Sequence, residues 1–480
     1  MIKKNIASIY EWKIKNYSWL ISTTLLFFFI ASGYIYGEKI HSSVVRADEW
    51  RFIRLYLMPY YEGAFSLKML FTDQHAGWFN GTIFILDAKF FELAGDLFFN
   101  IGMLSKGLVL ACLLIAIKKS FYNNGFLFCI VFFLIGSIFF SLKAPVEYNW
   151  PLVTRSNFFL LIFIIILMRV EVTLLTTLDK KNLLFIIVMI VLLLLSNRSA
   201  ALIMMLSLIS VLALYLMSNL ITKRKIDKNL VVLFGLIFLA IMFYYLMSKY
   251  FIGINKYSSV SSCDNLTCLQ ELSIDNLAKT FPIATLSGFI KIELLRQIIP
   301  SDKLFLLSYC VFAGYVFVFF LGLKKNIHIT TIIPFVLMLY PLLFVLSVDL
   351  FRYVPNNNHF DWRIVSPRYI KTYELGVIGF VWLFIKICAD YKKTFLNILL
   401  YFFALMFLAI YVYNVKTSIK MIPSYEKAND RAVNSLINYS GDKSEIPVWV
   451  LGGDFSEDKL LFLYQNELNV FSRRFELKNN

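Results

Sequence analysis

The sequence predicts an all-α polytopic membrane protein, with about eleven transmembrane helices and a small α/β appendage at its C-terminal end. Hydrophobic residues make up 59% of the 480 residues and the mean hydropathy is +0.69, a composition outside that of soluble domains. Apolar runs of about 18 or more residues recur along the chain, and each is long enough to cross a hydrocarbon core about 30 Å thick. Lysine and arginine cluster in the short connections between these runs, as they do in inner connections of membrane proteins.

The positive-inside rule orients these runs, beginning with an N-terminus that carries Lys3 and Lys4 on the inner side. No small-residue cleavage site follows the first run, which predicts an anchor that stays in place. Every inner connection then carries lysine or arginine. The expected spans cover about residues 17–37, 98–117, 124–142, 151–170, 182–196, 200–221, 230–248, 303–323, 329–348, 374–391 and 394–413.

This topology divides the chain into a membrane module, residues 1–414, and an outer appendage, residues 415–480. Within the appendage, residues 424–439 and 458–464 have helical spacing, and Val448–Leu451 has the composition of a buried strand. Such a small unit must pack on the membrane module, because it cannot build a large core of its own. The module has four outer loops, residues 38–97, 143–152, 249–302 and 349–373.

The first outer loop begins with a segment rich in charged and aromatic side chains, residues 45–52, which read VRADEWRF. If this segment continues as a helix, Trp50, Ile53 and Leu57 share one apolar face and leave Asp48 on a polar one. That pattern predicts a helix that lies at the bilayer surface and holds an acid there.

Three acids of the outer loops are candidate catalytic residues: Asp48, Glu49 and Glu147. One carboxylate beside an acceptor hydroxyl, with cations beside a leaving phosphate, would serve a single-displacement glycosyl transfer. We favour Asp48, then Glu49. Each acid also has a simpler explanation: Asp48 as a helix cap, Glu49 as the partner of a neighbouring arginine, and Glu147 as a solvated loop residue.

Cations on the outer side run against the positive-inside rule and need another explanation. A guanidinium group donates two parallel hydrogen bonds to a phosphate, which suits an anionic lipid-linked substrate. The alternative is that these groups pair with local carboxylates or with lipid headgroups. The candidate phosphate-binding residues are Arg155, Arg198, Arg352, Arg363, Arg368 and Lys371.

Other outer residues could contact a glycan acceptor or a metal ion: His75, Trp150, His359 and Asp361. Neither the segment around His75 nor the segment with His359 and Asp361 has a recognised metal-ligand spacing. Binding of a divalent cation therefore stays an open question, and no cofactor is assigned. The outer aromatic residues suit either an interfacial belt or a stacking surface for sugars.

Two cysteines, Cys263 and Cys268, lie in the polar third loop. They would form a disulfide if that loop faces an oxidising compartment, although so short an internal bridge can be strained.

Several functions lack their sequence patterns. The chain has no Walker loop, no regularly spaced arginines within a span, and few acids inside the spans, where ion-coupled transporters carry them. It also has no nucleic-acid-binding motif, so the net charge of +16 reflects orientation in the membrane.

An acidic pair directly after the first span, in a long outer loop, resembles the GT-C superfamily of polyprenyl-phosphate-dependent glycosyltransferases. Asp48 and Glu49 carry this resemblance, which is greatest to the phage-borne, serotype-converting O-antigen glucosyltransferases of enteric bacteria. The residues 197–199 (NRS) and 366–369 (SPRY) look like short signatures of related glycan enzymes. The architecture of the whole chain is similar, but few residues match.

The resemblance implies an enzyme of the bacterial inner membrane, with its N-terminus in the cytoplasm and its C-terminus in the periplasm. The implied donor is undecaprenyl-phosphate-glucose and the implied acceptor is an O-antigen repeat unit. A small flippase and the polyprenyl-phosphate glucosyltransferase of the same locus are the implied protein partners. An O-antigen polymerase, which would depend more on the outer arginines, and a flippase without chemistry are the alternatives.

Overall fold

The computed structural model consists of helices, and no strand occurs among the residues that it describes. These are residues 2–47, 49–71, 77–122, 124–176, 179–196, 198–221, 228–250, 274–324, 332–352, 365–391, 394–452 and 455–472. Within them, seven helices are long and apolar enough to cross a membrane. A helical membrane protein is therefore confirmed, while the full number of spans stays a prediction.

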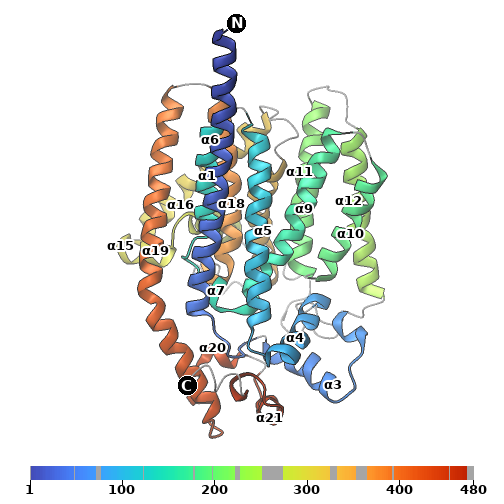
Figure 1. Cartoon of the computed structure of the whole chain (residues 1–480). Helices are drawn as coiled ribbons and strands as arrows, with labels where there is room; N and C mark the ends of the chain where they lie inside the picture. Colours follow the sequence, from blue (N-terminus) through green and yellow to red (C-terminus); the bar gives the residue numbers. More distant parts are fainter. Residues whose placement is uncertain are drawn as a thin grey trace.

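Each expected span falls on a helix. These helices are α1 (Ile2–Ile40), α5 (Asp96–Ser120), α6 (Gly125–Phe139), α9 (Ser156–Leu175), α10 (Lys180–Ser196), α11 (Arg198–Ile221), α12 (Lys228–Tyr250), α16 (Ser301–Lys324), α17 (Ile332–Arg352), α18 (Pro367–Tyr391) and α19 (Thr394–Ile437). In Figure 1 they stand side by side, with α19 at one edge and α10 and α12 at the other.

The short elements of the first outer loop and of the C-terminal part gather at the end of the bundle opposite the N-terminus (Figure 1). The first loop folds into α2 (Glu49–Phe52), the π-helical turn η1 (Ile53–Leu57), α3 (Met58–Tyr61), η2 (Leu67–Phe71) and α4 (Gly77–Phe91). The second loop forms α7 (Val146–Asn149) and α8 (Pro151–Thr154), and the C-terminal part forms η6 (Lys443–Glu445), α20 (Val448–Leu451), α21 (Glu457–Gln465) and η7 (Asn469–Phe471).

Part of the expected third outer loop is a helix inside the bundle. Residues 274–289 form α14 (Ile274–Phe289), which packs against α16, α17 and α18 and is followed by α15 (Ile292–Ile298). Its contact with α18 is close because Gly288 has no side chain: a Cβ there would lie 2.7 Å from the carbonyl oxygen of Tyr373. Helix α14 therefore brings backbone atoms next to α18 inside the bundle.

The C-terminal part differs from the expected α/β unit. The predicted strand Val448–Leu451 is wrong: it forms the helical turn α20, because its backbone bonds locally instead of to a neighbouring strand. The predicted helix 458–464 is confirmed as α21, whereas residues 424–437 continue α19 without a break after residue 414.

The C-terminal part does pack on the membrane module. The Val450 carbonyl accepts hydrogen bonds from the Ala47 backbone N–H (3.0 Å) and the Trp50 indole N–H (2.7 Å). The Asn469 side chain accepts from the Val45 backbone N–H at 3.2 Å and donates to the Leu93 carbonyl at 2.7 Å. These contacts hold the start of the first outer loop in place.

Helix α5 approaches α8 closely at Gly102, where a Cβ would lie 2.5 Å from the Thr154 carbonyl carbon. Because backbone cannot shift as a side-chain tip can, we expect Gly102→Ala to lower the free energy of unfolding by about 2 kcal/mol. Denaturant unfolding in detergent measures this. Gly235→Ala in α12, where an added Cβ would meet no other described part of the chain within 4 Å, is the control and should be neutral or stabilising. Equal stability of the two variants would contradict the close packing.

Candidate functional site

Glu49 begins α2 directly after α1 and is buried, with 5% of its surface exposed. Its carboxylate accepts two hydrogen bonds, from the backbone N–H of Arg46 at 2.9 Å and from the indole N–H of Trp150 at 3.2 Å. Burial raises the pKa of Glu49 to about 7, although the charge of Arg46 and these hydrogen bonds oppose the rise. A carboxyl with this pKa can exchange a proton near neutral pH, as a general base must.

The apolar face predicted after Glu49 is confirmed, because Trp50, Ile53 and Leu57 are all fully buried. It packs inside the protein and not on the bilayer surface: the Trp50 ring meets the Phe455 ring edge-on, with centroids 5.0 Å apart. The expected surface-helix role is therefore wrong for this face, since the C-terminal part covers it. The π-helical turn Ile53–Leu57 follows, a geometry frequent at functional sites.

Two buried arginines surround Glu49. The guanidinium of Arg46 donates to the backbone carbonyl of Asn149 and lies 5.3 Å and 5.2 Å from the rings of Trp150 and Trp449. Arg155 lies among aromatic rings, the nearest being Phe98 at 5.8 Å, and its charge lowers the pKa of Glu49. Arg155, predicted to bind phosphate, is therefore part of the surroundings of the acid.

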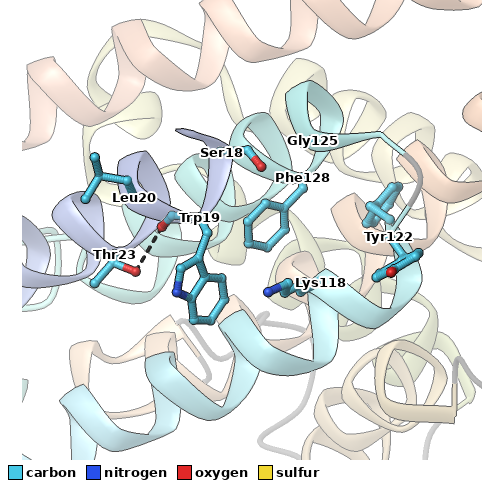
Figure 2. Close-up of a pocket in the computed structure, with 9 residues that line it drawn as sticks. Ser18, Trp19, Leu20, Thr23, Lys118, Tyr122, Gly125 and Phe128 are labelled. Atoms are coloured by element: carbon cyan, nitrogen blue, oxygen red, sulfur yellow. Dashed lines mark hydrogen bonds between the residues drawn. The ribbon is translucent and has the colours of Figure 1, made fainter. Parts of the chain in front are cut away.

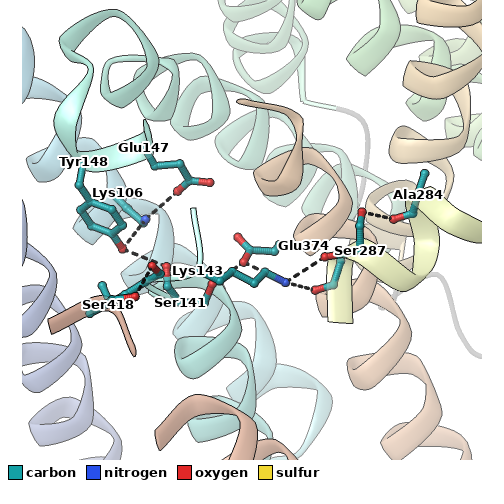
Figure 3. A network of polar contacts seen from close by, with 11 residues as sticks. Lys106, Ser141, Lys143, Glu147, Tyr148, Ala284, Ser287, Glu374 and Ser418 are labelled. Atoms are coloured by element: carbon teal, nitrogen blue, oxygen red, sulfur yellow. Dashed lines mark hydrogen bonds and ion pairs between the residues drawn. The ribbon is translucent and has the colours of Figure 1, made fainter. Parts of the chain in front are cut away.

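A second group of buried charges lies around α7 (Figure 3). We call it the α7 cluster, and it comprises Lys106, Lys143, Glu147, Tyr148, Lys371 and Glu374. The ammonium of Lys106 lies 3.0 Å from Glu147 Oε2 and donates to the Tyr148 hydroxyl at 2.9 Å. Glu147 is therefore not the solvated loop residue that the sequence left open.

The other ion pair of the α7 cluster joins Lys143 to Glu374 at 3.3 Å. Lys143 also donates to the carbonyls of Ser287 and Gly288 at the end of α14, which Figure 3 shows on the far side of Glu374. The Ser141 hydroxyl donates to the same carboxylate. The α14 helix thus holds one half of the cluster through its last carbonyls.

Two charged atoms of the α7 cluster have no hydrogen-bond partner within the described part of the chain: Lys371 Nζ and Glu147 Oε1. Lys371 is buried, lies 5.6 Å from the ring of Phe139 and is close enough to Glu147 and Glu374 for electrostatic interaction. Three lysines against two glutamates leave one positive charge in excess when all are ionised. Since a buried unpaired charge is costly, an anion beside Lys371 would stabilise its ammonium form.

The two groups adjoin in the chain. Glu147 and Trp150 are three residues apart, about one helical turn, and Trp150 donates to Glu49 while Glu147 pairs with Lys106. Thr154 Oγ1 donates to the Glu147 carbonyl at 2.7 Å and fixes this turn. One segment, residues 146–155, therefore holds both Glu147 and the indole that donates to Glu49.

Comparison of the chain with protein-family models, curated proteins and solved structures finds no match. Support for a function therefore comes from the geometry described above and from the sequence resemblance.

Several predicted site residues lie outside the described residues. They are Asp48, His75, Cys263, Cys268, His359, Asp361 and Arg363. Arg198 begins α11 and Arg352 ends α17, and the structure describes the backbone of both but not their side chains. Arg368 is exposed at the start of α18, whereas Lys371, one turn later, is buried in the α7 cluster. No group of three metal-binding side chains occurs among the described residues.

The sequence-based selection missed Lys106, Lys143 and Glu374. Lys106 is a charged residue in an otherwise apolar span, which is itself a signal of function. Glu374 follows Lys371 by three residues, so both lie on one helix face. Their partners come from distant segments, which spacing alone does not reveal.

Removal of one partner of a buried pair leaves the other unpaired, so Lys106→Met should lower the free energy of unfolding by about 3 kcal/mol. The double variant Lys106→Met/Glu147→Gln removes both charges and should recover most of this loss. Lys89→Met, at an exposed lysine, is the control and should change stability little. Unfolding in detergent measures all three, and a double variant no more stable than the single would contradict the pairing.

Proposed function

We propose that this chain is an integral-membrane glycosyltransferase that moves a sugar from polyprenyl phosphate to a glycan acceptor. The observation that carries the proposal is a buried acid, Glu49, with a pKa raised to about 7, which residues 147–150 connect to the buried α7 cluster. In that cluster Lys371 Nζ has no hydrogen-bond partner among the described residues. A base and a phosphate-binding cation are the two groups that a single-displacement transfer requires. The resemblance noted above supports glucose on undecaprenyl phosphate as the donor and O-antigen as the acceptor, on the periplasmic face of the inner membrane.

In the proposed reaction, an acceptor hydroxyl oxygen attacks the anomeric carbon of the donor sugar. Glu49 takes the hydroxyl proton, and the bond between the anomeric carbon and the phosphate oxygen breaks. The phosphate leaves with the bonding electrons as polyprenyl phosphate, and Lys371 with the rest of the α7 cluster stabilises its charge. Glu147 Oε1 accepts a hydrogen bond from a hydroxyl group of the donor sugar.

The pH dependence of transfer follows from the pKa of Glu49, which burial raises to about 7. A base must be ionised to accept a proton, so the rate should be low below this pH and rise as the pH passes through about 7. Initial rates between pH 5.5 and 9 at saturating donor measure this. Glu62→Gln, at an exposed acid of the same loop, should keep the profile, and a flat wild-type profile would contradict the assignment.

One observation favours a second function, transport of the lipid-linked sugar without chemistry. Lys106 lies about 15 Å along α5 from Asp96, roughly half a bilayer core, and charges buried at that depth are typical of transport paths. Its pair with Glu147, together with the pair of Lys143 and Glu374, would line such a path.

Reconstituted protein separates the two functions. Liposomes that contain polyprenyl-phosphate-sugar and receive a glycan acceptor should release polyprenyl phosphate and form an acceptor with one added sugar. Movement of intact donor between leaflets without its cleavage would favour the transporter instead. A ladder of lengthened acceptors would favour a polymerase.

A further inference from the structure

A cavity of about 540 Å³ lies between α1, α5 and the start of α6, towards the N-terminal end of the bundle (Figures 1 and 2). Its size is typical of sites for small ligands or parts of them. It does not include any residue of the candidate functional site. The lining residues are Ser18, Trp19, Leu20, Thr23, Lys118, Phe121, Tyr122, Gly125 and Phe128.

Among the described residues that line this cavity, Lys118 is the only charged one. Its ammonium lies 4.0 Å from the centroid of the Trp19 ring, which in turn stacks on Phe128 with centroids 6.3 Å apart. No carboxylate lies within ion-pair distance of Lys118 in the part of the chain that the structure describes. An aromatic platform thus holds a cation at the cavity without neutralising it, which leaves an anion as its natural partner.

The rim of the cavity is apolar and exposed. Leu20 and Tyr122, which line it, are 62% and 61% exposed, and the neighbouring Phe126 is 58% exposed. Helix α1, which carries Leu20, is long and apolar enough to cross a membrane, so Leu20 would face acyl chains there. Tryptophan, tyrosine and lysine together mark the depth of lipid headgroups.

We propose that this cavity binds the phosphate headgroup of an anionic membrane lipid. The lipid phosphate pairs with Lys118, the headgroup fills the cavity beside the hydroxyls of Ser18 and Thr23, and the acyl chains lie along the exposed apolar rim. The bound lipid joins α1 to α5 and α6 at the end opposite the candidate functional site. This proposal is independent of the glycosyltransferase proposal.

Binding of phosphatidylglycerol and of diacylglycerol, which has no phosphate, to the full chain delipidated in detergent tests the proposal by native mass spectrometry. Wild type should prefer phosphatidylglycerol, and Lys118→Gln should weaken binding of phosphatidylglycerol about tenfold with little change in the binding of diacylglycerol. Lys118→Arg should retain the preference because it keeps the charge. Lys89→Gln is the matched control, since Lys89 is also an exposed lysine near an aromatic ring, Phe90 at 5.5 Å, but does not line this cavity.

Three results would overturn the proposal: equal affinity for both lipids, an unchanged preference in Lys118→Gln, or the same loss in Lys89→Gln. A soluble competitor distinguishes a lipid from a free anion. Millimolar glycerol phosphate should not displace the bound lipid, because it lacks the acyl chains that contact the rim. If it does displace the lipid, the cavity is a site for a soluble phosphate.

Discussion

Glu49→Gln is expected to lower the rate of sugar transfer by about a hundred- to ten-thousandfold, because it removes the proposed general base. Glutamine has nearly the same size and cannot take a proton at neutral pH. Its amide oxygen can still accept one of the two hydrogen bonds that Glu49 accepts, from the Arg46 backbone or from the Trp150 indole. The donor affinity should therefore change little, while the free energy of unfolding should fall by about 1 to 3 kcal/mol because the other buried N–H then faces the amide NH2 group.

The measurement for this variant is the initial rate of polyprenyl-phosphate release in detergent or liposomes, together with unfolding to confirm the fold. Glu62→Gln is the control, because Glu62 is an exposed acid of the same loop. A Glu49→Gln protein that transfers sugar at the wild-type rate would exclude Glu49 as the base. The acid directly before it, Asp48, would then be the next candidate.

Lys371→Met is expected to weaken donor binding and transfer by about a hundred- to a thousandfold, since it removes the unpaired cation proposed to hold the phosphate. The same change should not destabilise the protein. Methionine fills similar space without a buried ammonium that has no hydrogen-bond partner among the described residues, so the free energy of unfolding should rise by about 1 kcal/mol. This combination of greater stability and lost activity distinguishes a binding residue from a structural one.

Arg368→Gln supplies the matched control for Lys371→Met. Both residues lie in the first turns of α18, but Arg368 is exposed and Lys371 is buried in the α7 cluster. Equilibrium binding of polyprenyl phosphate and unfolding in detergent should be close to wild type for Arg368→Gln. A Lys371→Met protein that is destabilised and still binds polyprenyl phosphate normally would contradict the proposed phosphate site.

The membrane helices could be predicted from the sequence because hydropathy is a local property. Every expected span overlaps a helix in its described part, and the periodic stripe of Trp50, Ile53 and Leu57 is buried as its spacing indicates. The partner of that stripe was not predictable, because Val450 is 400 residues away from Trp50. The spacing of these residues predicts an apolar helix face but not what covers it, so the bilayer surface was the expected location.

The candidate site shows the same limit. Glu49, Glu147, Arg155 and Lys371 were selected because they are charged and lie in or beside expected outer loops. The ion pairs and hydrogen bonds that these residues form involve residues from other spans. Lys106, for example, pairs with Glu147 and lies 41 residues before it. The strand expected at Val448–Leu451 failed for a related reason, since four apolar residues form a strand only beside a partner strand.

The account assigns the chemistry to one buried acid, Glu49, and the binding of the donor phosphate to a buried cation of the α7 cluster, Lys371. The most direct test measures donor binding and polyprenyl-phosphate release in the same preparations of wild type, Glu49→Gln and Lys371→Met. The account predicts that Glu49→Gln binds the donor normally and fails to release polyprenyl phosphate, whereas Lys371→Met loses donor binding. The account would be contradicted if either variant released polyprenyl phosphate at the wild-type rate. It would also be contradicted if the wild-type protein released none with donor and acceptor present.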